Sequence, residues 1–452
     1  MIETILKQQK DYFNNGQTLS LSSRIHALDT LEAAIKSHQQ ALEDALRQDL
    51  AKSPFEAYAT EIGFILRSLR DMKKMIKPHM RVKRVKTPWT QVGSKSYTRD
   101  EPLGSVLIIG PYNYPFQLVI EPLIGALAAG NTAIVKPSEF TPNTAAVIEA
   151  MLNGAFEPAL VKVFTGGAEV TQSLTAQPFN HIFFTGSTRV GQLVYEAAAK
   201  NLVPVTLELG GKSPTIVDET ANLKVAARRI VYGKFLNAGQ TCIAPDYVYV
   251  HESVVDDFVH TLSETLKSFY PDNPNAMGHI VNEGHYTRLK ALIDPKKVIY
   301  EGTHQPETRY LSPVLMQGVT WEDGVMKEEI FGPILPILSY RNLNEVIEEI
   351  RAHEKPLALY LFSENKATQE TVFSTLSFGG GAINDTIMHV ANPHLPFGGV
   401  GASGIGAYHG KHSLETFSHR KAYMKKSTRF DPSFLYPPYS EKQVGLIKKI
   451  LK

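Results

Sequence analysis

The only cysteine of the chain, Cys242, lies in the segment FLNAGQTCIAP, residues 235–245, among small residues, Gln240 and Thr241. A free cysteine most often packs as a small buried hydrophobic residue, and it is a nucleophile only as its thiolate. Taken alone, the position favours a core residue over a nucleophile. The other candidate residues are needed to distinguish a core cysteine from a nucleophile.

Glu208 is a second candidate, because it lies in the otherwise apolar run PVTLEL and is followed by Gly210 and Gly211. A carboxylate in this place is either the partner in a structural ion pair or a base whose pKa is raised by burial. The buried position favours the base.

Two further groups of polar residues could bind a nucleotide. In KPSE, Lys136 and Glu139 could hydrogen-bond ribose hydroxyls. In FTGSTRVG, Gly186 and Gly191 flank a turn whose N–H groups could face a pyrophosphate at a helix N-terminus. This is not the G-x-G-x-x-G pattern, and surface charge and an ordinary tight turn remain the alternatives.

All of these residues follow predicted strands. Helical segments separate five short β-rich runs, which are SVLII, TAIVK, VKVF, HIFF and PVTLEL. This alternation predicts an α/β fold with a parallel sheet covered on both faces. Ligands of such sheets bind beyond the carboxyl ends of the strands. The candidate residues are therefore expected at one edge of the sheet.

The regions that flank this sheet have other patterns. Residues 1 to about 78 are predicted to be helical, with Pro78 as the end, because apolar residues recur at helical spacing: Leu28, Leu31, Ile35, Leu42 and Leu46. From Arg81, RVKRVKTPW alternates charged and apolar residues, which predicts an exposed strand. No aromatic residues interleave with these cations, so a solvated edge is favoured over nucleic-acid binding.

Composition limits the class of protein. The 452 residues include 47 basic and 45 acidic side chains, a net charge of +2 that gives no reason to expect a nucleic-acid or membrane partner. No run approaches the ~20 apolar residues of a membrane span. A single cysteine cannot close an intramolecular disulfide, which fits a reducing compartment. We expect a cytoplasmic protein that acts on a small molecule.

Taken together, the motifs resemble the aldehyde dehydrogenase superfamily. VTLELGGKSP and NAGQTC resemble the paired signature of that family, and five other segments resemble its remaining blocks in order: GPYNYPF, GNTAIVKPSE, FFTGS, EEIFGPILPI and LPFGGVGASGIGAYHGK. The last block and the short N-terminal region resemble the class 3 branch, which contains fatty-aldehyde and aromatic-aldehyde dehydrogenases.

The resemblance implies a catalytic role for three residues. Cys242 would attack the aldehyde carbonyl to form a thiohemiacetal. Asn113 would donate to the oxyanion together with the Cys242 N–H. After hydride transfer to the nicotinamide cofactor, Glu208 would activate water to hydrolyse the thioester to the carboxylic acid.

The resemblance also implies residues that hold the cofactor and the aldehyde. The implied cofactor residues are Lys136, Glu139, Gly186, Ser187, Thr188, Val190, Gly191, Leu209, Glu329 and Phe331. Tyr112, Tyr114 and Phe397 would line the aldehyde pocket, although aromatic residues are more often core. Glu139 would repel a 2′-phosphate, so we predict a preference for NAD with some use of NADP. Such a pocket favours a medium- to long-chain aliphatic or an aromatic aldehyde.

By the same analogy the chain has a Rossmann-like cofactor domain, an α/β catalytic domain and a small bridging β-sheet. The expected ranges are 1–79 with 103–210 for the cofactor domain, 211–417 for the catalytic domain, 80–102 with 418–430 for the sheet, and 431–452 for a C-terminal tail. In this family such a sheet joins subunits, so we predict a homodimer.

Two weaker features remain. His409 and His412 lack accompanying ligands at a usual metal spacing, so we predict no metal site. The tail segment VGLIKKILK has the pattern of an amphipathic helix. It is predicted to pack on its own protein, with weak peripheral membrane binding as the alternative.

Three other functions stay open. A CoA-acylating dehydrogenase would transfer the acyl group to CoA, which a carboxylate at position 208 argues against. A cofactor-free thiol hydrolase would need a histidine partner for Cys242. A non-catalytic member of the family would tolerate loss of Cys242, Asn113 or Glu208, and all three residues are present.

Overall fold

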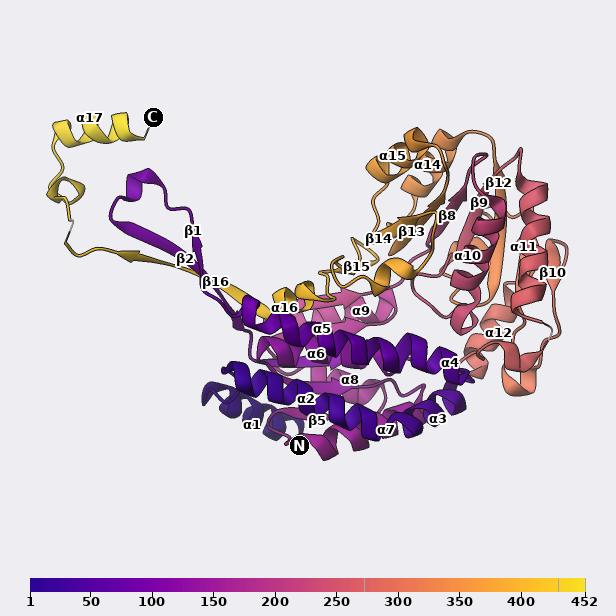
Figure 1. Cartoon of the computed structure of the whole chain (residues 1–452), viewed down its shortest axis with the longest axis horizontal. Coiled ribbons are helices and arrows are strands. Elements are labelled where there is room, and N and C mark those ends of the chain that lie inside the picture. Colours follow the sequence, from indigo (N-terminus) through magenta and orange to yellow (C-terminus); the bar gives the residue numbers. More distant parts are fainter. Residues whose placement is uncertain (272, 430, 452) are drawn as a thin grey trace.

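The computed structural model of the chain describes residues 1–271, 273–429 and 431–451. In this part of the chain, helices cover two large sheets, and a narrow three-stranded sheet extends away from both (Figure 1). Phe430 and Lys452, at the ends of the predicted sheet and tail segments, lie outside the described residues.

Helices fill the first 79 residues, as predicted: α1 (Ile2–Asn14), α2 (Leu21–Ser37), α3 (Gln39–Leu50), α4 (Pro54–Ala57), the π-helical turn η1 (Tyr58–Ile62) and α5 (Gly63–His79). The predicted apolar face of α2 and α3 is completely buried. It packs in one core with α6 (Gln117–Ala129), whose residues are all buried. α5 ends one residue beyond Pro78, which lies in its last turn.

The five predicted strands form one sheet. They are β3 (Ser105–Ile109), β4 (Thr132–Lys136), β5 (Val161–Val163), β6 (His181–Thr185) and β7 (Val205–Glu208), all parallel, with the short antiparallel strand β15 (Gly404–Ile405) at the edge. The connecting helices are α6, α7 (Pro142–Ala155), α8 (Ala168–Thr175) and α9 (Thr188–Ala199). The strand order β15-β7-β6-β3-β4-β5 changes direction between β3 and β6, where ligands of such sheets bind.

A second sheet has the order β10-β11-β12-β9-β8-β13-β14. Its strands are β8 (Pro214–Val217), β9 (Tyr247–His251), β10 (Val298–Glu301), β11 (Val314–Gln317), β12 (Ile334–Tyr340), β13 (Ala358–Phe362) and β14 (Gly380–Ile383). Its helices are α10 (Leu223–Phe235), α11 (Val255–Phe269), α12 (Glu283–Ala291), α13 (Gly324–Lys327), α14 (Leu343–Ala352) and α15 (Lys366–Thr375). Only β10 is antiparallel to its neighbour, and a separate apolar core surrounds this sheet.

The third sheet is antiparallel and joins β1 (Lys83–Val85), β2 (Ser94–Pro102) and β16 (Ser418–Lys426). All three residues of β1 are exposed, which confirms the strand predicted after Arg81. Tyr97 and Tyr423 pair across β2 and β16 with their rings stacked 5.3 Å apart. The sheet leads away from α16 (Lys411–Thr416) as an arm (Figure 1).

The tail forms the predicted helix, α17 (Glu441–Ile450), but its predicted packing is wrong. None of its residues is buried, and Val444 and Leu446 remain 47% and 42% exposed. α17 lies beyond the arm, away from both large sheets (Figure 1). The arm carries the chain out of reach of the cores, so the apolar residues of α17 have no protein surface to cover.

Candidate active site

The segment that carries Cys242 follows α10 in an unusual conformation. In the 3-10 turn η3 (Leu236–Gly239), Asn237 and Ala238 both have φ of 54°, and Gly239 has φ of 72°. A side chain on Gly239 would come within 2.3 Å of the Gly332 carbonyl oxygen, so glycine is required there. The Gln240 side chain then donates to the Asn237 and His279 carbonyls and accepts from the Val281 N–H. These bonds fix the segment that leads into Cys242.

The Cys242 thiol is free and partly buried. Burial is the main cause of a pKa well above the usual range of a thiol, and the charges of Glu329 and Glu208 raise it further. Hydrogen bonds from the N–H groups of Cys242 and Ile243 favour the thiolate and act in the opposite direction. The resting thiol is therefore protonated at neutral pH.

Glu208 ends β7, where it pairs in register with Thr185 of β6 and Gly404 of β15. Its side chain is buried, and among the described residues neither carboxyl oxygen has a hydrogen-bond partner. Burial raises the pKa of Glu208 well above its usual range. Because neither oxygen has a partner among the described residues, a structural ion pair does not explain this residue. Burying a carboxyl group without a partner costs about 1–3 kcal/mol or more.

Asn113 lies in the turn between β3 and α6 and is 2% exposed. Its Nδ2 donates to the Gln240 carbonyl oxygen at 3.0 Å, and its own carbonyl oxygen accepts from Asn237 Nδ2 at 2.8 Å. The Asn113 amide therefore lies against the turn that carries Cys242. Tyr114, the next residue, is hydrogen-bonded through its hydroxyl to Thr241 Oγ1 at 2.8 Å.

Lys136 and Glu139 contact each other at the end of β4. Lys136 Nζ lies 2.5 Å from Glu139 Oε2, with the lysine buried and the glutamate partly exposed. Because β3 and β4 are parallel and Ile109 pairs with Lys136, this ion pair lies at the same sheet edge as the turn that holds Asn113. The carboxylate is thus placed at the edge, with its charge partly balanced by the lysine.

The N-terminus of α9 follows β6 at this edge. Ser187 caps the helix by accepting from the Val190 N–H, and Thr188 Oγ1 donates to the Ala402 carbonyl oxygen at 3.2 Å. A side chain on Gly191 would come within 2.6 Å of Leu209. A side chain on Gly186 would lie equally close to the Phe184 ring. Packing alone therefore explains both glycines, and the free N–H groups at the capped terminus are the feature suited to a phosphate.

Glu329 approaches the site from the second sheet. A Cβ atom on Gly210 would lie 2.0 Å from Glu329 Oε2, so the absent side chain makes room for the carboxyl group. Burial, and to a smaller extent the charge of Asp246, raise the pKa of Glu329 to about 8. The Gly211 N–H and the cations Lys212 and Lys234 oppose this change.

The predicted pocket aromatics fall into separate groups. Tyr112 packs edge-on against Phe331, with ring centroids 5.9 Å apart, and also contacts Phe140 and His285. Tyr112 therefore lies with the predicted cofactor residue Phe331. Its ring contacts do not include Phe397.

Phe397 belongs to the other group. Its ring stacks on His409 at 5.2 Å and on His389 at 6.2 Å, and Phe64 also contacts His409. Cys242 packs against the core that contains Phe397. His409 Nδ1 lies 3.1 Å from the Val390 carbonyl oxygen, whereas His412 pairs with Glu415.

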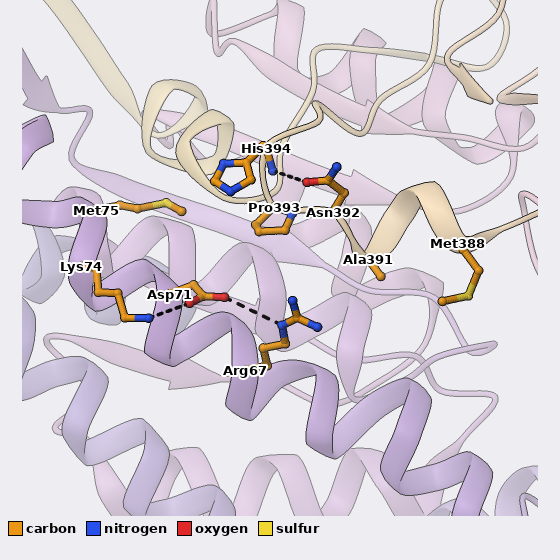
Figure 2. Close-up of a pocket in the computed structure, with 9 residues that line it drawn as sticks. All are labelled: Arg67, Asp71, Lys74, Met75, Met388, Ala391, Asn392, Pro393 and His394. Carbon is orange, nitrogen blue, oxygen red and sulfur yellow. Dashed lines mark hydrogen bonds and ion pairs between the residues drawn. The ribbon is translucent and has the colours of Figure 1, made fainter. Parts of the chain in front are cut away.

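A surface pocket of about 530 Å³ has Met388, the residue before His389, in its lining (Figure 2). The 3-10 turn η6 (Met388–Ala391) and the residues after it form one wall, and α5 forms the other. The lining residues are Arg67, Asp71, Lys74, Met75, Met388, Ala391, Asn392, Pro393 and His394. Asp71 lies between Lys74 and Arg67, which keeps the charges of this wall paired (Figure 2).

Comparison with known proteins identifies this arrangement. The sequence profile described as the aldehyde dehydrogenase family matches residues 1–423. The chain belongs to the aldehyde dehydrogenase family. It is therefore an oxidoreductase that converts aldehydes to carboxylic acids with NAD or NADP, and it has the fold expected from the sequence.

Relatives of this aldehyde dehydrogenase include the 4,4'-diaponeurosporen-aldehyde dehydrogenase of Staphylococcus aureus, which is 54% identical over 98% of the chain and 97% of the relative. The dimeric NADP-preferring aldehyde dehydrogenase of Rattus norvegicus is 43% identical over 97% of the chain and 98% of the relative. A solved structure described as the substrate-bound state of Staphylococcus aureus AldH superposes with a TM-score of 0.98, at 52% identity and full coverage of both chains.

Three polar residues beside the predicted site were not predicted from the sequence. Asn237, Lys52 and Glu61 all bond to the segment that begins with Asn113. Asn237 is in the motif next to Cys242, and its position there was a usable signal. Lys52 follows α3 and Glu61 lies in η1, and nothing in the sequence around either charge distinguishes it from an exposed residue.

Proposed function

We propose that Cys242, Asn113 and Glu208 carry out aldehyde oxidation through a covalent thioester. The observation that supports this best is a free thiol whose pKa is raised by the charge of Glu208, a buried carboxyl group without a hydrogen-bond partner among the described residues. The Asn113 amide lies against the same turn. A nucleophile, a base and an oxyanion donor are the three groups that this chemistry needs.

In the proposed mechanism the Cys242 thiol first loses its proton to solvent. The resulting thiolate bonds to the aldehyde carbon, and the carbonyl π electrons move to oxygen. Asn113 Nδ2 and the Cys242 N–H stabilise the resulting oxyanion. When bound, NAD(P) supplies the acceptor for the hydride that leaves the tetrahedral carbon. Glu208 takes a proton from water, whose oxygen attacks the thioester that remains on Cys242. The carbon–sulfur bond breaks, and the carboxylic acid is released as Cys242 recovers its electron pair.

The residues at the sheet edge suit a dinucleotide. The capped terminus of the 12-residue helix α9 presents free N–H groups for a pyrophosphate, with Ser187, Thr188 and Val190 beside Gly186 and Gly191. Glu139 would accept bonds from the adenosine ribose, with Lys136 beside it. Leu209, Glu329 and Phe331 would hold the nicotinamide half, because Gly210 leaves room for the Glu329 carboxyl group. We propose NAD as the preferred cofactor and NADP as an alternative.

The proposed substrate is a medium- to long-chain aliphatic or an aromatic aldehyde. The rings of Phe397, His409 and Phe64 pack together, Phe397 belongs to the core against which Cys242 packs, and Tyr114 bonds to Thr241, the neighbour of Cys242. The name of the Staphylococcus aureus relative, 4,4'-diaponeurosporen-aldehyde dehydrogenase, also gives an aldehyde as the substrate of that protein.

We further propose a cytoplasmic homodimer. The arm exposes Trp89, Val92, Tyr423 and Met424, which are 69%, 61%, 44% and 48% exposed, and exposed apolar strands of this kind are normally covered by a partner. No helix among the described residues has the length and hydropathy of a membrane span. The exposed apolar residues of α17 keep weak peripheral binding as a second proposal. Sedimentation of the purified protein, with and without vesicles, tests both.

One assay tests the proposed reaction. The protein is mixed with octanal, benzaldehyde or succinic semialdehyde and with NAD or NADP, and absorbance is followed at 340 nm without and with CoA. We expect CoA-independent oxidation, fastest with octanal or benzaldehyde. Oxidation that requires CoA would favour the acylating alternative, and no oxidation of any aldehyde would favour a non-catalytic member. A higher rate with the semialdehyde would contradict the proposed substrate class.

A further inference from the structure

A fully buried ion pair lies behind the Asn113 turn. Lys52 Nζ is 2.5 Å from Glu61 Oε1, and both side chains are 0% exposed. Lys52 follows α3, and Glu61 lies in the π-helical turn η1. Single π-helical turns within helices are often found near functional sites. The pair is outside the set of residues that carry the proposed chemistry.

Both members of the pair bond to the main chain around Asn113. Lys52 Nζ donates to the Asn113 carbonyl oxygen at 3.0 Å. Glu61 Oε2 accepts from the N–H groups of Phe116 and Gln117 at 2.9 and 3.1 Å, at the start of α6. The ion pair therefore holds the turn at two points, one on each side of Tyr114.

The front of the same turn is bonded to the Cys242 segment. Asn113 Nδ2 donates to the Gln240 carbonyl oxygen at 3.0 Å. Asn237 Nδ2 donates to the carbonyl oxygens of Asn113 and Gln240, at 2.8 and 3.1 Å. The Asn113 carbonyl oxygen is thus shared by Lys52 and Asn237. A shift of this oxygen would move the Asn113 amide relative to Cys242.

Stability alone is a poor explanation for the pair. Two charges that move out of water lose hydration free energy, and their mutual attraction often does not compensate for this loss. Proteins in which apolar residues of similar volume replace such a pair are frequently as stable as the original or more stable. The geometry suits a different role, because three hydrogen bonds between two charged groups and the main chain define where one turn lies.

We propose that Lys52 and Glu61 are positioning residues, which hold the Asn113 amide where the oxyanion develops. The inference rests on the proposed role of Asn113. Neither residue touches the reacting atoms. Displacement of a catalytic group by about 1 Å costs up to about 100-fold in rate, so loss of the pair should slow the step that forms the thioester.

The test is a double-mutant cycle on the complete enzyme. The first NADH burst with octanal at saturating NAD reports thioester formation in Lys52→Met, Glu61→Gln, Asn113→Ala and the two combinations with Asn113→Ala. Asn113→Ala should slow the burst about 100- to 1000-fold. Lys52→Met and Glu61→Gln should each slow it about 10- to 100-fold. Each combination should be within about twofold of Asn113→Ala alone, since residues acting through one group are not additive.

Asp49→Asn is the matched control. Asp49 is buried and accepts four hydrogen bonds from Asn143 and Thr144 at the start of α7, a similar anchoring role at a different helix. This variant should lower the melting temperature without slowing the burst. Lys52→Arg, which keeps the charge, should recover part of the rate, and the NAD dissociation constant, measured by fluorescence, should stay within about twofold in all variants.

The outcomes separate the two proposals. If Asn113→Ala leaves the burst unchanged, the proposed role of Asn113 is wrong. If Asn113→Ala slows the burst but the combinations are slower still, by the product of the single effects, the positioning role is wrong and the oxyanion role stands. If Lys52→Met does not fold, Glu61→Gln gives the same decision, because its amide oxygen can still accept from Phe116.

Discussion

The carboxyl group of Glu208 lies close enough to Cys242 for its charge to raise the pKa of the thiol. The two residues come from different sheets, since Glu208 ends β7 and Cys242 follows α10. Both groups are held in their neutral forms by burial, and each negative charge opposes the other. The arrangement favours ionisation of one group at a time, the thiol before the thioester forms and the carboxyl group afterwards.

Alkylation of the free enzyme should reveal the raised pKa of Cys242. The thiolate is the reactive form, so the rate of labelling by iodoacetamide should rise about tenfold per pH unit and continue to rise above pH 9. Labelling is followed by mass spectrometry, and the absence of any other cysteine makes the product unambiguous. A plateau near pH 7 would show a thiolate already stabilised at rest.

Glu208→Gln should separate hydride transfer from hydrolysis. The thioester should form and accumulate, giving a burst of about one NADH per site followed by turnover slowed about 100- to 10,000-fold. Mass spectrometry should find the acyl group on Cys242. Unchanged steady turnover would assign Glu208 to structure, and a burst that slows as well would give Glu208 a part in deprotonating the thiol.

Glu121→Gln is the matched control for this experiment, because Glu121 is another buried glutamate, in α6. Its Oε1 accepts from Ser68 Oγ at 2.7 Å, a bond that glutamine preserves. Its turnover should stay within about twofold of the unmodified enzyme, because the proposed mechanism assigns no role to Glu121.

Most of this fold could be predicted from the sequence. The β-rich runs from Ser105 onward predict strands because a parallel sheet buried on both faces needs continuous apolar segments. The helical face around Leu28 follows from its spacing. The exposure of α17 could not be predicted, because an apolar stripe does not say whether a partner surface is within reach.

The candidate site, like the fold, could be predicted from the sequence only in part. Cys242 and Glu208 follow from motifs, and their neighbourhood follows from the strand ends. Tyr112 lies with Phe331 and not with Phe397, which depends on side-chain directions that no spacing defines. The burial of Lys52 and Glu61 depends on two helices meeting the Asn113 turn, and the same charges would suit a solvated surface.

Glu139→Gln should shift the cofactor preference toward NADP. The carboxylate is paired with Lys136, and its loss removes a charge that would repel a 2′-phosphate while freeing the lysine to attract one. The ratio of kcat/KM for NADP to that for NAD should rise roughly tenfold, or about 1.4 kcal/mol. An unchanged ratio would mean that Glu139 points away from the ribose of the bound cofactor.

Glu121→Gln should also change how the stability of the enzyme depends on pH. Burial raises the pKa of Glu121 from 4.5 to about 7. A carboxyl group whose pKa is higher in the folded state binds its proton more tightly there, so its contribution to stability is complete below pH 4.5 and is lost as the pH rises through 7. At pH 8 the folded enzyme has to bury the charge, and glutamine removes that cost, which is about 3 kcal/mol for a shift of this size. The variant should therefore melt at a higher temperature than the unmodified enzyme at pH 8, and the difference should shrink toward pH 5.

Glu348→Gln, an exposed position on α14, provides the control and should show no such pH-dependent difference. Equal melting temperatures at pH 8 would mean that Glu121 reaches water when it ionises.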